Sequence, residues 1–264
     1  MKAVLLCAGY GTRLYPLTKN QPKPLLPVGG RPILDYLLEK VEEIPGVDQV
    51  CVVTNDKFFP HFKQWAKERS KAHLAIEAVN DGTQSEEERL GAIGDLFFLI
   101  QKFQLREEMA VFAGDNFFDF SLKDFARFAV AHRPHVSLGV VDLKEIRLAS
   151  QYGIVRVEGE GRVLEFIEKP KHPPSTLSST GIYWIPKESI DLLVRYIQEG
   201  HNADRLGDCM AWLVKVDRLY AYRFEGDWLD IGDLDSYRKA DCLLSQKKSK
   251  RSPRDLKERR STKL

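Results

Sequence analysis

The sequence lacks the features that mark membrane, secreted and metal-cluster proteins. No apolar run reaches the roughly 18 residues of a membrane-spanning helix, and Met1 and Lys2 lead straight into a short apolar segment, not a leader peptide. The four cysteines form no Cys-x-x-Cys pair and the six histidines do not cluster, which argues against a disulfide framework and a zinc site. We therefore expect a soluble, cytoplasmic protein with no membrane partner.

Two common phosphate-binding patterns are also missing. A dinucleotide-binding turn needs Gly-x-Gly-x-x-Gly, but the segment that begins Gly9-Tyr10-Gly11 has Leu14 at the place of the third glycine. The Walker pattern, Gly-x-x-x-x-Gly-Lys-Ser/Thr, fits nowhere in the chain. An NAD-binding oxidoreductase is therefore disfavoured, although glycines do follow the first apolar segment.

What the sequence does have is a regular alternation of strand-like and helix-like segments. With 43% apolar residues in 264, the chain can bury a sizeable core. The expected strands of the first half are 3–7, 49–54, 74–79, 109–113 and 136–141, and the expected helices are 33–43, 58–70, 90–103 and 122–131. This rhythm predicts an α/β fold with a mostly parallel, twisted sheet and helices on both faces.

The second half has a different pattern. Segments 154–157 and 163–167 flank Glu158-Gly159-Glu160-Gly161, which is typical of a hairpin turn. Further strands are expected at 181–185 and 219–224, and helices at 188–198 and 233–245. We expect a small mixed β extension beside the parallel sheet.

Charge is concentrated at the C-terminus. Residues 247–264 carry nine Lys or Arg against Asp255 and Glu258, a balance of +7, so the remainder sums to about −5 because the whole chain is +2. We expect one domain over 1–246 and a basic tail over 247–264 that is disordered or loosely helical. A nucleic-acid partner is disfavoured against a solvated terminus or one ordered only in a homo-oligomer.

The loop after the first strand predicts a phosphate site. Gly9 and Gly11 leave backbone N–H groups open to a polyanion, and Arg13 can pair with phosphate through its planar fork. Lys23 lies between Pro22 and Pro24, which stiffen the backbone that carries its ammonium group.

These residues form part of a longer motif. Gly-x-Gly-Thr-Arg-Leu-x-Pro-Leu-Thr runs over 9–18, and Pro-Lys-Pro-Leu-Leu-Pro-Val runs over 22–28. The stretch resembles the signature of sugar-1-phosphate nucleotidyltransferases, such as glucose-1-phosphate thymidylyltransferase and mannose-1-phosphate guanylyltransferase. The resemblance covers roughly residues 1–245. It implies a Rossmann-like fold, an NTP and a sugar-1-phosphate or similar phosphorylated acceptor as substrates, and nucleotide contacts from Ala8, Gly9, Gly11, Thr12 and Arg13.

Two aspartates are candidates for a metal site. Asp115 follows an apolar strand and Gly114, which permits a close turn into a cleft, and Asp230 stands in Trp-Leu-Asp-Ile-Gly. The resemblance implies that both bind the metal, which we expect to be Mg²⁺ because that ion takes one or two carboxylates and completes its shell with phosphate and water. Asp233 is interpreted instead as the N-cap of the next helix. Arg13, Lys23, Asp115 and Asp230 are thus the candidate catalytic residues.

The acceptor side is expected from Glu-Lys-Pro at 168–170. Glu168 can accept sugar hydroxyls and Lys169 can reach the acceptor phosphate, provided that the strand bends there, since neighbouring side chains on a strand face opposite ways. By resemblance, the sugar pocket also includes Tyr152, Gly153 and Gly181.

The base pocket departs from the thymidylyltransferase pattern. In place of the glutamine-led segment with Pro-x-Gly, the chain has the stretch 80–92. Asn80, Thr83 and Gln84 can hydrogen-bond a base edge, Gly91 can admit the flat base against the helix start, and Gly82 is also expected among the nucleotide contacts. The base, the sugar and the oligomeric state stay open. The rival interpretation is a non-catalytic regulatory subunit of the same fold, which would be expected to have lost one of the four candidate catalytic residues.

Overall fold

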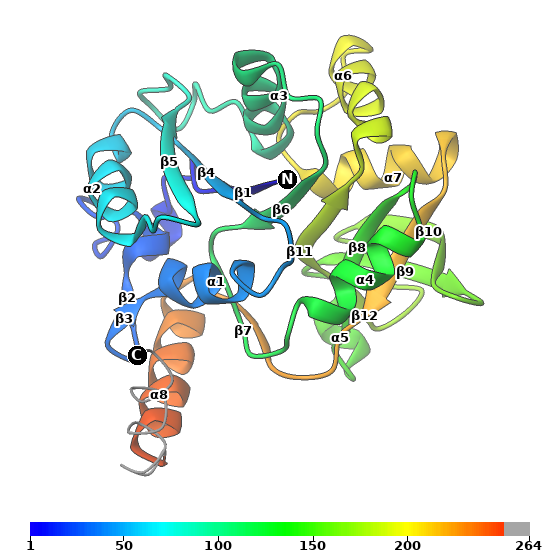
Figure 1. The fold of residues 1–264 in the computed structure, drawn as a ribbon. Coiled ribbons are helices and arrows are strands. Elements are labelled where there is room, and N and C mark those ends of the chain that lie inside the picture. The colour runs from blue at the N-terminus through cyan, green and yellow to red at the C-terminus, as the bar shows by residue number, and fades with distance from the viewer. Residues whose placement is uncertain (251–264) are drawn as a thin grey trace.

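A nine-stranded mixed sheet forms the centre of the molecule (Figure 1). The computed structural model describes residues 1–250. From one edge to the other, the strands are β5 (Ala75–Asn80), β4 (Gln49–Thr54), β1 (Lys2–Leu6), β6 (Met109–Ala113), β11 (Leu177–Ile185), β8 (Val136–Asp142), β12 (Leu219–Arg223), β10 (Arg162–Glu168) and β9 (Gly153–Glu158). The first four are parallel, and β11 is antiparallel to both β6 and β8. The expected parallel sheet is therefore confirmed for the first half.

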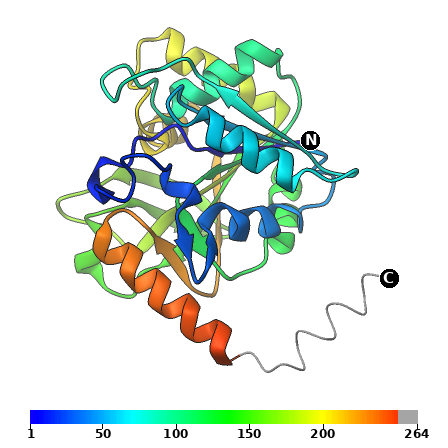
Figure 2. The ribbon, with the colours of Figure 1, turned by 90° about the vertical axis from the view of Figure 1, so that its left-hand side faces the viewer.

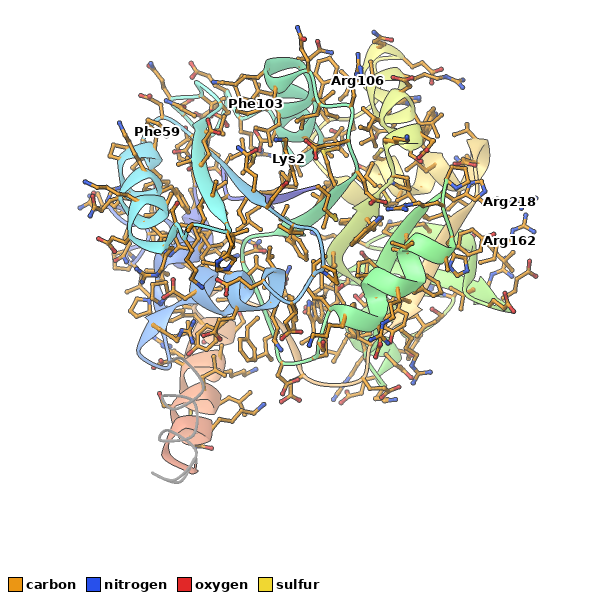
Figure 3. The ribbon with its side chains drawn as sticks, in the orientation of Figure 1. Lys2, Phe59, Phe103, Arg106, Arg162 and Arg218 are labelled. Atoms are coloured by element: carbon orange, nitrogen blue, oxygen red, sulfur yellow. The ribbon has the colours of Figure 1, made fainter. Side chains whose placement is uncertain are left out.

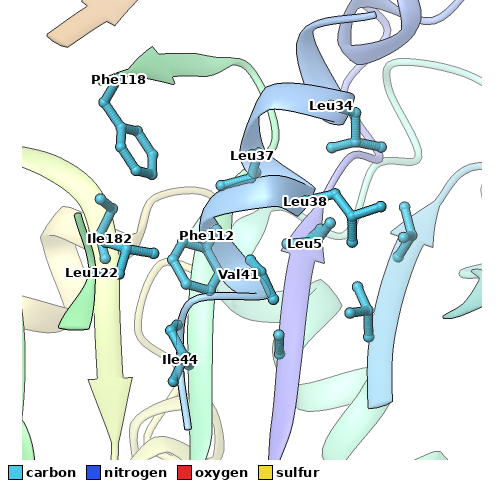
Figure 4. Close-up of a cluster of buried hydrophobic side chains, with 14 of the residues drawn as sticks. Leu5, Leu34, Leu37, Leu38, Val41, Ile44, Phe112, Phe118, Leu122 and Ile182 are labelled. Atoms are coloured by element: carbon cyan, nitrogen blue, oxygen red, sulfur yellow. The ribbon is translucent and has the colours of Figure 1, made fainter. Parts of the chain in front are cut away.

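Helices cover both faces of the sheet, as predicted. Their residues and the strand residues beneath them form two buried clusters, the first with α1 (Ile33–Val41), α2 (Phe59–Arg69) and α4 (Lys123–Ala131), the second with α3 (Ala92–Phe103), α6 (Ile190–Gln198) and α7 (Leu206–Val216). Strand β1 shows why: Ala3 and Leu5 pack in the first cluster and Val4 in the second, because successive side chains of a strand alternate between faces. Figure 4 shows Leu5 facing α1, and Figure 3 shows side chains filling the space between the layers.

A third, smaller cluster holds the C-terminal helix α8 (Leu234–Lys250) against the body. Its neighbours are the hairpin of β2 (Pro27–Val28) and β3 (Arg31–Pro32), and the short sheet of β7 (Asn116–Phe118) and β13 (Trp228–Asp230). Figure 2 shows α8 beside that hairpin, where the Tyr237 hydroxyl donates to the Pro27 carbonyl at 2.7 Å. Asp233 caps α8 by accepting from the Ser236 N–H at 2.8 Å, which confirms its expected role.

The second half shows both successes and omissions of the sequence patterns. Strands β9 and β10 form the predicted hairpin and extend the main sheet at its edge. Helix α7, the short helix α5 (Ile146–Ala149), β7 and β13 were not predicted. The expected boundary after residue 246 falls inside α8, and most of the basic tail, 251–264, lies outside the described residues.

Two absences expected from composition concern the described residues only. Over residues 1–250, no helix is long and apolar enough to cross a membrane. All four cysteines are free thiols, and Cys7, Cys51 and Cys209 are buried while Cys242 is exposed.

Candidate active site

A cavity of about 350 Å³ opens where β1 and β6 end and α3 begins. Its wall includes the whole segment from Leu6 to Arg13, together with Lys23, Gly91, Asp95 and Asp115. The carboxyl ends of parallel strands meet at one edge of a sheet, which explains why segments distant in sequence converge here. Of the residues proposed for the nucleotide, Ala8, Gly9, Gly11, Thr12, Arg13 and Gly91 line this cavity.

The glycine loop is held by hydrogen bonds from outside it. Gly11 has φ +64°, and its carbonyl accepts from the Thr18 hydroxyl at 2.7 Å. The Ala8 carbonyl accepts from the Asn55 amide at 2.8 Å. These contacts fix the loop in a shape that only glycine adopts without strain at Gly11. The loop is thus preformed, and its main chain forms one wall of the cavity.

Lys23 and Asp115 form an ion pair within the cavity wall. Lys23 Nζ lies 2.7 Å from Asp115 Oδ2, and Lys23 is only 7% exposed. Burial disfavours ionisation of Asp115, but the positive charge of Lys23, assisted by Arg13, outweighs it and holds the pKa of Asp115 below its usual range. Asp115 therefore carries a negative charge near neutral pH and is available as an oxygen ligand.

The backbone brings Asp230 beside Asp115. In the β7–β13 pair, Asp230 lies opposite Asn116, and the Ile231 N–H donates to the Asp115 carbonyl at 3.3 Å. A side chain built on Gly232 would begin 3.5 Å from Asp230 Oδ2 and 3.7 Å from Arg13 Nη1. The Arg13 guanidinium and the Asp230 carboxylate thus both lie close to Gly232; Arg13, Lys23 and Asp115 line the cavity, and Asp230 does not.

The two aspartates differ in electrostatics. Burial, reinforced by the negative charge of Asp115, raises the pKa of Asp230 to about 6. Because one carboxylate is already ionised, a second beside it is costly unless a cation arrives. A divalent ion would remove that repulsion, so the pair suits a hard cation such as Mg²⁺. Among residues 1–250, no group of three or more His, Cys, Asp or Glu side chains is arranged to hold a metal ion.

The third hydrophobic cluster lies directly beneath these groups. It contains Leu14, Leu26, Phe117 and Ile231, which are close in sequence to Arg13, Lys23, Asp115 and Asp230 respectively. Leu244 of α8 packs in the same cluster. The C-terminal helix therefore packs against the segments that carry the four candidate catalytic residues.

The acceptor side is built where β10 ends. Lys169 has φ +47°, so the chain turns sharply after Glu168 and the two side chains can serve one site, as the sequence required. The Lys169 N–H donates to the Tyr152 carbonyl at 3.0 Å. Burial, with help from the charge of Asp208, raises the pKa of Glu168.

Two glycines make room for Glu168. A Cβ on Gly153 would lie 2.9 Å from Glu168 Oε2, and one on Gly207 would overlap the same oxygen. Gly207 belongs to α7, a helix that the sequence patterns missed. The only sequence signal for this contact was a glycine in the first turn of a helix that the patterns did not predict.

Tyr152 and Gly181 border the same region. Tyr152 packs edge-on against Trp228 with ring centroids 5.2 Å apart, and burial together with the charge of Asp230 raises its pKa. Gly181 has φ +74° and presses on Ala113 and Asn116, at the place where the pairing of β11 shifts. Tyr152, Gly153, Glu168 and Lys169 thus lie close to one another, whereas Gly181 lies against Ala113, which lines the nucleotide cavity.

Four expected nucleotide contacts do not line the cavity: Asn80, Gly82, Thr83 and Gln84. The Asn80 side chain is used within its own turn, where its Oδ1 accepts from the Gly82 N–H at 2.8 Å and its Nδ2 donates to Asp56 at 2.7 Å. Thr83 is buried, and its hydroxyl donates to Asp81 at 2.7 Å. The cavity wall instead contains residues that were not predicted, namely Tyr10, Glu86, Arg89, Asp95 and Asp204.

The sequence profile of a family described as nucleotidyl transferase matches residues 2–247. The chain belongs to this nucleotidyl transferase family. The chain is 30% identical over 232 residues to the bifunctional protein GlmU of Methanocaldococcus jannaschii, covering 88% of the chain and 51% of that protein. It is 30% identical over 250 residues to the UTP–glucose-1-phosphate uridylyltransferase of Synechocystis sp., covering 91% and 62%. The chain therefore spans about half to three fifths of these relatives' length.

Solved structures show the same fold. A UDP-glucose pyrophosphorylase complexed with UDP-glucose superposes with a TM-score of 0.77 at 22% identity, covering 93% of the chain and 98% of that structure. A UTP-bound UGPase from Acinetobacter baumannii gives a TM-score of 0.74 at 24% identity, covering 94% and 96%. At these identities the likeness establishes the Rossmann-like α/β fold of the chain and nothing beyond it.

Proposed function

We propose that the chain transfers a nucleotidyl group from an NTP to a sugar-1-phosphate or similar phosphorylated acceptor, giving an NDP-sugar and pyrophosphate. In this reaction an acceptor phosphate oxygen attacks the α-phosphorus and the bond to the bridging α–β oxygen breaks. The electron pair leaves with pyrophosphate, so no oxidant or reductant is needed. The observation that carries the proposal is that Arg13, Lys23 and Asp115 line the cavity at the glycine loop, with Asp230 on the strand paired beside Asp115.

Each side chain has a role that follows from its position. The glycine-loop amides and Arg13 bind the β- and γ-phosphates, where a planar guanidinium can bridge two oxygens. Lys23, stiffly held and buried, neutralises charge at the α-phosphate during transfer. Glu168 accepts sugar hydroxyls, and Lys169 pairs with the acceptor phosphate. Catalysis here is positioning and charge neutralisation, since the protein forms no covalent bond to substrate.

Asp115 and Asp230 would hold Mg²⁺, which when bound supplies charge neutralisation and Lewis acidity at the phosphates. Lys23 Nζ lies 2.7 Å from Asp115 Oδ2, so this lysine also holds the Asp115 carboxylate in place.

The direct test is pyrophosphate release on mixing the purified full-length chain with Mg²⁺, each of the common NTPs and a panel of sugar-1-phosphates. We expect at least one pair to release pyrophosphate in step with NDP-sugar formation. Asp115→Asn is the negative control. No release from any pair, combined with retained nucleotide binding, would favour the regulatory subunit.

A further inference from the structure

The segment between β5 and α3 is tied to both sides of the nucleotide cavity by polar contacts. The Thr12 hydroxyl of the glycine loop donates to Glu86 Oε1 at 3.3 Å, and Arg89 Nε donates to Asp204 Oδ1 at 3.1 Å. Arg89 Nη1 also lies 3.8 Å from Glu86 Oε1. All four residues line the cavity. Residues 86–89 therefore connect the glycine loop with the loop before α7, and they form part of the wall around the proposed nucleotide.

The contact at Thr12 engages a donor that belongs to the phosphate loop. Thr12 lies between Gly11 and Arg13, in the loop proposed to bind the β- and γ-phosphates. A threonine hydroxyl has one hydrogen, so it can donate to Glu86 or to a phosphate oxygen, but not to both at once. The group that accepts this hydrogen in the structure is a carboxylate, which is an anionic oxygen acceptor like a phosphate. Glu86 therefore stands where a phosphate oxygen is expected.

Glu86 has room to leave Thr12. Its side chain is 42% exposed, and within residues 1–250 its carboxylate accepts no hydrogen bond other than the one from Thr12. A second cavity of about 440 Å³ is lined by Glu86, Arg89 and Asp204 together with Glu87 and Asn202. Because three residues belong to both cavities, they form the wall between them. The Glu86 side chain can thus turn from the nucleotide cavity to the second cavity or to solvent.

We propose that the Glu86 carboxylate competes with the phosphates of NTP and with pyrophosphate for the Thr12 hydroxyl. An incoming NTP takes over this hydroxyl and turns Glu86 out of the cavity, and Glu86 returns to Thr12 when pyrophosphate leaves. The competition lowers the affinity for both polyphosphates and so favours release of the product. This inference rests on the proposed function, because it assigns a further residue to the phosphate end of the same site.

The test measures the dissociation constant of pyrophosphate with Mg²⁺ by calorimetry on the full-length chain, since this probe does not depend on the base. Glu86→Gln keeps the size of the side chain but removes its charge. It should bind pyrophosphate about 3- to 10-fold more tightly, because Thr12 donates less strongly to a neutral amide and the repulsion between anions is gone. Glu86→Ala should bind at least as tightly. An NTP that the wild type binds should gain similarly, whereas its monophosphate should change little.

Glu87→Gln is the matched control, because it removes the same charge one residue away. Glu87 lines the second cavity but not the nucleotide cavity, so the dissociation constant for pyrophosphate should stay near the wild-type value. A second control uses Thr12→Val, which lacks the hydroxyl. In that background Glu86→Gln should tighten pyrophosphate binding less than it does in the wild type, because the two anions no longer share a donor.

Three results would overturn the proposal: no tighter binding of pyrophosphate in either Glu86 variant, an equal gain in Glu87→Gln, or an equal gain with and without the Thr12 hydroxyl. Failure of wild type and variants alike to bind pyrophosphate would overturn it as well. Tighter binding in Glu86→Gln of a chain that turns over no pair of NTP and acceptor would uphold this inference while the proposed function fails. Turnover without any gain in affinity would do the reverse.

Discussion

The nucleotide half and the acceptor half of the cleft differ in whether main chain or side chains form the key contacts. On the nucleotide side, the wall includes much main chain, namely the loop after β1 and Gly91 before α3, and Gly91 lies tight against the backbone of Ala203 and Asp204. On the acceptor side, the key group is a side chain, Glu168, which lies over Gly153 and Gly207. Substitutions in the nucleotide half should therefore act mainly by lowering folding stability. Substitutions in the acceptor half should instead lower the affinity for the acceptor. Asp115 belongs to the first half through Lys23, while Asp230 faces the second, where Tyr152 and Lys169 lie within range of its charge.

Substitution of Asp115 or Asp230 should impair both halves of the cleft, because this carboxylate pair lies where the two halves meet. We expect Asp115→Asn and Asp230→Asn each to lower kcat by roughly 10²- to 10³-fold, as for loss of a group that stabilises transition-state charge. Their effects on folding should be opposite. Asp115→Asn leaves the buried Lys23 without its partner and should cost about 1–2 kcal/mol, discounted because Asp115 is 36% exposed. Asp230→Asn removes a repelled carboxylate and should raise the melting temperature of the metal-free protein. Equal destabilisation by both would contradict the assigned electrostatics.

The backbone character of the nucleotide half can be tested at Gly91. A methyl group there would overlap the backbone at Ala203 and Asp204, and φ is +81°, so Gly91→Ala should destabilise the protein by about 2–3 kcal/mol. It should also raise the KM for NTP. Gly82→Ala is the matched control, since φ is +87° but nothing lies within 4 Å of the added methyl. Its cost should be limited to about 1 kcal/mol of backbone strain. Urea unfolding measures both, and similar values would show that the contact with residues 203–204 is unimportant.

The difference between the halves also explains what the sequence could predict. The nucleotide side depends on local segments, so the glycine loop, Lys23 between prolines and the Gly-Asp turn at Asp115 could be recognised one at a time. Because the carboxyl ends of parallel strands lie at one edge of a sheet, these segments could also be expected to meet. The acceptor side depends on a helix that begins 38 residues after Glu168, and on Gly207 within it. No side chain caps the N-terminus of α7 with a hydrogen bond, so the residues before it give no helix-start signal that a sequence pattern could recognise.

Asn80 and Thr83, which were expected to contact the base, do not line the cavity, and the reason there is different. Asn80 and Thr83 had suitable chemistry, but the turn that they form uses their polar groups internally. Asp95 lies inside a helix whose apolar pattern concealed it, and its place in the cavity wall comes from packing that no local pattern contains. Residue chemistry alone predicts which groups can bind, and only the fold decides which are already satisfied.

The side-chain character of the acceptor half can be tested at Gly207. The methyl of Gly207→Ala would displace the Glu168 carboxylate, which can swing away at little cost, so the acceptor KM should rise by roughly tenfold, about 1.4 kcal/mol. The KM for NTP should not change. Alanine is a better helix former than glycine by up to about 1 kcal/mol, so stability should be unchanged or higher. Reduced acceptor affinity in a more stable protein cannot come from unfolding. In a Glu168→Gln background the added methyl should have a smaller effect, and full additivity would remove Glu168 from the explanation.

The smallest expected effect is the pH dependence that Asp230 gives to the metal-free protein. An aspartate in the unfolded chain has a pKa near 3.8, and the folded value is about 6, so the native state binds more protons between these values. The stabilisation associated with protonated Asp230 is therefore complete below about pH 4 and is lost as pH rises to about 6. The change should be about 1–2 kcal/mol, less than the full shift because the site is partly solvated. Other carboxylates also titrate in this range, so the measured quantity is the difference in free energy of unfolding between wild type and Asp230→Asn, in EDTA, from pH 4 to 7. Asp115→Asn should shrink that difference, because it removes the charge that repels Asp230. If the difference is flat with pH, Asp230 has an ordinary pKa and its carboxylate does not sense Asp115.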